Sequence, residues 1–192
     1  MNLRQAAANA ATGLSIITLW FVTGCSPDAA ASSTELITTI PPEQTSSVTT
    51  SYKDATYEIN GRPIKLTNGI SEIEAAPGSA SKIVTKYFGN EATGDFNGDG
   101  LPDVAFLITQ STGGSGTFFY SVVAIKTSSG YTGTNAVLLG DRIAPQTTGF
   151  RNGEIIVNYA DRKPGEAMTD RPSAGVSKYL KVVNGKLEVV QR

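Results

Sequence analysis

Residues 94–103 read Gly-Asp-Phe-Asn-Gly-Asp-Gly-Leu-Pro-Asp, and residues 104–110 continue as Val-Ala-Phe-Leu-Ile-Thr-Gln. The first part mixes acidic and amide side chains with glycines, which favour tight turns because they tolerate positive φ angles. The second part is nearly continuously apolar, which is typical of a strand covered on both faces. The stretch therefore predicts an acidic turn that leads directly into a central strand of a sheet.

The oxygen-bearing side chains of this turn have the spacing of a loop that wraps a calcium ion. Asp95 is position 1 of this loop. Asn97, Asp99 and Asp103 then stand at the liganding positions 3, 5 and 9, and Leu101 stands at position 7, where the backbone carbonyl is the ligand. Calcium takes about six to eight oxygen ligands. Three carboxylates this close also repel one another unless a cation neutralises them. We therefore expect one structural Ca²⁺ ion here; the alternative is an acidic β-turn that binds no ion.

The turn differs from an EF-hand, because the position where an EF-hand needs a bidentate glutamate is Phe106. It resembles instead the loop of FG-GAP repeats, the calcium-binding blades of integrin-type β-propellers. Phe88-Gly89, residues 94–100 and residues 102–105 (Pro-Asp-Val-Ala) carry this resemblance. A propeller needs several copies in tandem, and this chain has one. The resemblance implies the loop chemistry but neither the propeller fold nor its ligand-binding role.

Residues 52–192 predict an all-β or β-dominated domain. Asn-Gly pairs supply the positive φ angles of type I′ hairpin turns, and three of them predict hairpins at 55–66, 146–159 and 178–190. Further strands are expected at 104–110, 117–127 and 131–139, and residues 81–88 are either a strand or a short helix. Because no segment has a long 3.6-residue period, we expect an antiparallel sandwich or small barrel of about eight to ten strands.

The first 24 residues predict a lipoprotein signal peptide. Arg4 precedes an apolar run that ends in Val22-Thr23-Gly24-Cys25, and this order is typical of a secretory signal. The last four residues resemble the bacterial lipobox. The resemblance implies cleavage before Cys25, a diacylglyceryl group on its sulfur and acylation of the new amino terminus. The alternative is an uncleaved membrane helix of residues 5–24, which nearly has the length to cross a bilayer of ~30 Å.

Residues 25–51 combine this cysteine with a segment rich in serine, threonine, alanine and proline. Such a segment has no face to bury, so we expect a disordered tether. Ser26 follows the cysteine, and the resemblance to small bacterial envelope lipoproteins implies sorting to the outer membrane when no aspartate stands there. The expected partner is thus the membrane, through lipid on Cys25, with the domain facing the periplasm or the cell surface.

The composition excludes several kinds of catalytic site. The chain has no histidine and one cysteine, so it has no Ser-His-Asp or Cys-His triad and no Cys/His zinc site. The net charge is −1 and the basic residues are dispersed, which gives no reason to expect nucleic acid as a partner. Ser79 and Lys82 match the Ser-x-x-Lys nucleophile motif, but its partner motifs are missing, so we attribute the match to chance.

The longest polar interruption of the folded segment is 161–172. With Asp141 and Arg142 this loop is a candidate binding surface of mixed charge, and the alternative is a solvated loop. Asp161 and Glu166 are a candidate carboxylate pair for a glycosidase if they flank a sugar at about 5–9 Å. We predict a binding or envelope-interaction module for a protein or polysaccharide ligand. The alternative is a carboxylate-based hydrolase acting on envelope polymer.

Overall fold

The computed structural model describes residues 50–192. Strands make up 60% of the structure and helix 2%, and antiparallel sheets pack together. The prediction of a β-dominated antiparallel sandwich is therefore confirmed. The predicted signal peptide, the lipid-modified Cys25 and most of the predicted tether lie outside the described residues.

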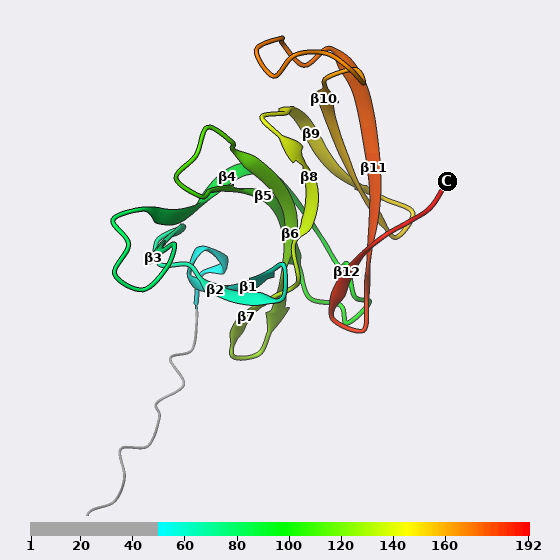
Figure 1. The fold of residues 1–192 in the computed structure, drawn as a ribbon. Coiled ribbons are helices and arrows are strands. Elements are labelled where there is room, and N and C mark those ends of the chain that lie inside the picture. Colours follow the sequence, from blue (N-terminus) through cyan, green and yellow to red (C-terminus); the bar gives the residue numbers. More distant parts are fainter. Residues whose placement is uncertain (1–49) are drawn as a thin grey trace, which may run out of the picture. The chain divides into compact units, whose positions relative to one another are not determined.

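Twelve strands follow a short 3₁₀ turn, more than the eight to ten expected (Figure 1). In chain order the elements are η1 (Tyr52–Asp54), β1 (Thr56–Ile59), β2 (Arg62–Lys65), β3 (Ile70–Glu74), β4 (Lys82–Gly94), β5 (Asp103–Ser111), β6 (Phe118–Thr127), β7 (Gly130–Gly133), β8 (Val137–Asp141), β9 (Ala144–Arg151), β10 (Glu154–Asp161), β11 (Ala174–Val183) and β12 (Lys186–Val189).

The strands form one large sheet and two smaller ones. The large sheet has the order β3-β4-β5-β6-β7, and β8 pairs with β6 as well. Strand β7 pairs with the second half of β6, and β8 pairs with its first half. The two short strands therefore lie end to end along the same edge of β6. The second sheet has the order β12-β11-β10-β9, and β1-β2 is a separate hairpin (Figure 1).

Strand β5 lies between two hydrophobic cores, as its continuous apolar sequence predicts. Successive side chains of a strand point to opposite faces of the sheet. Val104, Phe106 and Ile108 accordingly join the core that contains the β1-β2 hairpin. Ala105 and Leu107 join the core that contains the β9–β12 sheet. The large sheet is therefore covered on both faces.

The three hairpins predicted from Asn-Gly pairs all form. They are β1-β2, β9-β10 and β11-β12, and in each turn both residues have positive φ, as at Asn60 (51°) and Gly61 (77°). The segment 81–88, for which the sequence allowed a strand or a short helix, is strand from residue 82 onward, as the start of the thirteen-residue strand β4. The local pattern was thus sufficient to place the hairpins.

The single strand predicted at 131–139 was wrong, because a contact with β1 divides it into β7 and β8. Glu58 donates its N–H to the carbonyl of Thr134 (3.1 Å), and Ala136 donates to the carbonyl of Glu58 (2.7 Å). The side chain of Asn135 meanwhile donates to and accepts from the backbone of Leu187 on β12 (2.9 and 2.8 Å). Residues 134–136 therefore connect all three sheets.

Gly133 supports a first prediction. A Cβ atom there would lie 2.3 Å from the carbonyl oxygen of Thr56 and 2.6 Å from the ring of Tyr57, whereas one at Gly175 of β11 would meet nothing within 4 Å. We expect Gly133→Ala to lower the free energy of unfolding in urea by about 3 kcal/mol or more, because it forces β1 off the large sheet. Gly175→Ala is the control, expected to stay within about 0.5 kcal/mol of the parent. Equal values for both variants would contradict this packing.

Candidate functional site

Asp103, the first residue of β5, connects the acidic turn to the large sheet. Its side chain is fully buried, with 0% exposure. Its carboxylate accepts hydrogen bonds from the backbone N–H of Phe96 (3.0 Å) and from that of Lys126 on β6 (2.7 Å). A buried carboxylate is costly unless donors compensate it. These two bonds therefore fix the turn against both β5 and β6.

The pKa of the Asp103 carboxyl reflects this position. Burial raises the pKa above its ordinary value, and the charges of Asp99 and Asp95 add to the increase. The N–H donors of Lys126 and Phe96 oppose it, because they stabilise the ionised form. The three acidic side chains of the turn thus lie close enough to interact through their charges.

The exposed half of the turn is organised around Asp95. Its carboxylate accepts the backbone N–H groups of Gly98 (2.7 Å), Asp99 (3.1 Å) and Gly100 (2.9 Å). The two glycines have φ angles of 83° and 84°, which a residue with a Cβ adopts only with strain. Asp99 in turn accepts the N–H of Leu101 (2.8 Å). The chain therefore curls around the Asp95 carboxylate.

The donor set of this turn fits a calcium ion in its chemistry. Asp95, Asn97 and Asp99 are exposed, and each Asp103 oxygen accepts one N–H, which leaves it a further lone pair. Within residues 50–192, however, no three acidic side chains converge as a ready metal centre. To hold the ion, carboxylates of the turn must exchange contacts with backbone N–H groups for contacts with the metal.

The turn also contacts the second sheet. The ring of Phe96 belongs to the core between the two larger sheets, and it packs edge to face against Phe150 of β9 with ring centres 4.8 Å apart. A Cβ at Gly94 would lie 2.7 Å from the Phe150 ring, so a larger residue there would force this ring to move. The acidic turn therefore lies where β4, β5 and β9 meet.

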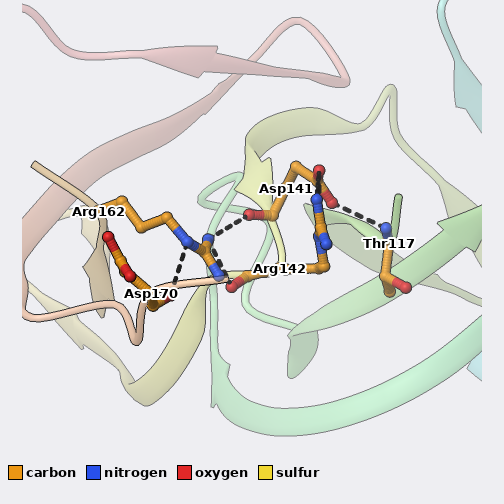
Figure 2. Close-up of polar contacts among 5 residues, drawn as sticks. All are labelled: Thr117, Asp141, Arg142, Arg162 and Asp170. Atoms are coloured by element: carbon orange, nitrogen blue, oxygen red, sulfur yellow. Dashed lines mark hydrogen bonds and ion pairs between the residues drawn. The ribbon is translucent and has the colours of Figure 1, made fainter. Parts of the chain in front are cut away.

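The 161–172 loop is held by Arg162 (Figure 2). The guanidinium donates from Nε to the carbonyl of Asp170 (2.8 Å), and from Nη1 to the carbonyls of Asp141 and Arg142 (3.2 Å each). The loop is closed at its base by the N–H of Ser173, which donates to the carbonyl of Asp161 (2.9 Å). The structure thus places the loop beside Asp141 and Arg142, while most residues of the loop itself are exposed.

The corner between β8 and β9 is fixed from the other side by Thr117. Asp141 accepts the N–H of Thr117 at Oδ1 (2.8 Å), and Arg142 donates its own N–H to the Thr117 carbonyl (2.8 Å; Figure 2). Within the described part, Arg142 is the one residue with positive φ (50°) that is neither glycine nor asparagine. This strained conformation persists because the surrounding hydrogen bonds determine it.

The candidate catalytic residues each make local contacts. Asp161 accepts the N–H of Arg162 (2.7 Å) and Glu166 accepts that of Lys163 (2.8 Å). The Ser79 hydroxyl accepts the N–H of Ser81, and Lys82 pairs with Glu72 (3.1 Å). Each of four surface pockets of the described chain is lined by at most one carboxylate.

No helix within residues 50–192 is both long and apolar enough to cross a membrane. Comparisons of the chain with known protein families, with curated proteins and with solved structures found no match.

Several contacts of these sites could not be found in the sequence. The donors to Asp103 and Asp141 are backbone groups of Lys126 and Thr117, which lie 23 and 24 residues away in the chain. Because these donors belong to the main chain, the identity of a residue does not indicate that it donates to a distant carboxylate. Arg162 did lie inside the loop singled out from the sequence, and its position directly after a strand was the one available clue.

Asp103 supports a second prediction. Asp103→Asn keeps the volume but turns an NH₂ group toward one of two backbone N–H donors. Since hydrogen bonds to charged groups contribute about 1.5–3 kcal/mol each, we expect the free energy of unfolding to fall by about 2–4 kcal/mol. Urea denaturation measures this, and Glu188→Gln on the exposed surface of β12 is the control for loss of one negative charge. Similar small changes in both variants would show that the buried carboxylate is dispensable.

Proposed function

We propose that this chain is a bacterial lipoprotein, anchored to a membrane by lipid on Cys25, whose β-domain binds a ligand in the cell envelope. The observation that carries the binding role is the position of the 161–172 loop, which Arg162 fixes to the carbonyls of Asp141 and Arg142. A loop that is ordered before binding loses less conformational entropy when a ligand arrives. Such a loop is suited to recognition.

The lipobox-like sequence at Val22–Cys25 supports the anchor. A diacylglyceryl group together with an amino-terminal acyl chain exceeds the two signals that stable anchoring requires. The segment after Cys25 would then connect the membrane to the domain. If this segment is a disordered tether, as its composition predicts, its root-mean-square length would be roughly 25–30 Å and the domain would remain near the membrane surface.

A calcium ion at Asp95–Asp103 has a structural role in this proposal. Asp95, Asn97, Asp99, the Leu101 carbonyl and Asp103 would hold it, and the ion would neutralise the three carboxylates. The turn already connects β5 to β6 through Asp103 and reaches β9 through Phe96. Neutralising its charges would stabilise the junction of the two larger sheets.

The anchor is tested by Cys25→Ser in a bacterial host that processes lipoproteins. We expect the parent chain to appear in the membrane fraction and to incorporate radiolabelled palmitate, whereas Cys25→Ser loses both properties because serine cannot form the thioether. Ser26→Ala leaves the cysteine in place and is the control. Membrane retention of Cys25→Ser without label would support the uncleaved helix instead.

Calcium binding is tested on the chain from Ser26 onward by its melting temperature. A ligand that binds the folded state alone at 100 times its Kd adds about 2.7 kcal/mol of stability, so millimolar Ca²⁺ should raise the Tm above that in chelator. Asp99→Asn keeps an acceptor for the Leu101 N–H but removes a charge, and we expect it to reduce the shift. Asp170→Asn, in the 161–172 loop, should retain the full shift. No shift in the parent, or an equal one in Asp99→Asn, would exclude this site.

A further inference from the structure

A pocket of about 380 Å³ lies on the large sheet beside the fixed corner described above. It is lined by side chains of β3, β4 and β5 and by the residue that precedes β6, namely Glu72, Val84, Lys86, Thr109, Ser111 and Thr117. These positions are neighbours in the sheet, because Glu72 pairs with Val84, Val84 with Ser111 and Lys86 with Thr109. Thr117 connects the pocket to Asp141 and Arg142 (Figure 2). The pocket is thus built on rigid elements.

Lys86 carries the one charge of this pocket that the described residues leave without a partner. Glu72 pairs with Lys82 at 3.1 Å, and Asp141, next to the pocket, pairs with Arg142 at 3.3 Å. No hydrogen bond or ion pair within residues 50–192 involves the ammonium of Lys86. An exposed ammonium on a polar floor favours a negatively charged group of a ligand.

Hydroxyl groups surround this ammonium. Those of Ser111 and Thr117 make no hydrogen bond within the described part of the chain, and that of Thr109 makes only a long one, to the Lys86 carbonyl (3.5 Å). Each hydroxyl can donate one hydrogen bond and accept two. The pocket therefore offers a cation together with several small groups that both donate and accept, which matches a ligand with a carboxylate and many hydroxyls.

Phe88 supplies an exposed apolar surface on the same strand as Lys86. It follows Lys86 by two residues on β4, and 48% of it is exposed. Its ring is supported edge to face by Phe119, with ring centres 5.2 Å apart. The register of β4 shifts between Tyr87 and Gly89, and such bulges redirect side chains. Phe88 is therefore an exposed ring that packs on Phe119, and Phe119 is the partner on β6 of the pocket residue Thr109.

We propose that this pocket binds an acidic saccharide, with Lys86 pairing with its carboxylate, the hydroxyls of Thr109, Ser111 and Thr117 bonding to its hydroxyls, and Phe88 packing against the sugar ring. This inference rests on the binding role proposed above and assigns it a site and a ligand class. An acidic peptide would also satisfy Lys86. It would not use three small hydroxyls and an exposed ring together, which is why the sugar acid is the better match.

The test is isothermal titration calorimetry of the full chain in detergent micelles with trigalacturonic acid. Its fully methyl-esterified form lacks the charge, and triglutamate with an acetylated N-terminus and an amidated C-terminus (called triglutamate below) carries three carboxylates without a sugar ring. We expect the ester and triglutamate to bind at least about tenfold more weakly than the free acid, a factor that corresponds to about 1.4 kcal/mol.

Matched variants locate the binding. Lys86→Met keeps the aliphatic stem and should weaken trigalacturonate binding about tenfold, whereas Lys181→Met, an exposed lysine of β11, should leave it unchanged. Phe88→Leu, which keeps apolar volume but not the ring face, should weaken trigalacturonate more than triglutamate. All these side chains are exposed, so the variants should keep the melting temperature of the parent.

Three results would overturn the proposal: no binding of trigalacturonate at about 10 mM, a concentration that detects even millimolar affinity; undiminished binding by Lys86→Met; or equal affinity for triglutamate, which would indicate an acidic peptide site. None of these results bears on the proposed lipid anchor at Cys25, because membrane retention is measured in a separate experiment. Conversely, a parent chain that binds the saccharide but is not retained in the membrane would contradict the anchor and support the saccharide site.

Discussion

The buried carboxylate of Asp103 is the interaction on which the arrangement of the larger sheets depends. Ionised groups are rarely fully buried, because removal from water is costly unless hydrogen bonds compensate it. Here two backbone N–H groups, from Phe96 and Lys126, provide that compensation. One side chain thereby fixes the acidic turn to β5 and β6, and the turn places Phe96 against Phe150 of the second sheet.

Two further points where the large sheet joins the rest of the domain lie at the ends of β8. Residues 134–136 bond to β1 through their backbone and to β12 through the Asn135 side chain. At the β8–β9 corner, Arg162 and Thr117 hold Asp141 and Arg142 from opposite sides. At both points the hydrogen bonds come from side chains or from backbone outside the regular strand pairs. The second point leaves a rigid, polar rim beside a pocket, which is where we place ligand recognition.

Much of the fold could be predicted because its signals are local. Asn-Gly turns fix hairpins within a few residues. A continuous apolar run such as 104–110 predicts a strand that is buried on both faces, whichever elements of the fold pack against it. The site was predicted less completely. The turn of Asp95–Asp103 and the 161–172 loop were visible as motifs, but the partners that hold them are backbone groups of distant strands.

The sequence by itself determined that this is a β-domain of hairpins with an acidic turn before its central strand, since turn chemistry and alternation act over neighbouring residues. The tertiary structure alone decided that the predicted strand 131–139 divides, because Glu58 of β1 occupies its middle. It also decided that Asp103 serves as a buried acceptor and that Lys86 lines one pocket together with three hydroxyl side chains. Those outcomes depend on strand register and sheet packing, which bring together residues that the chain holds far apart.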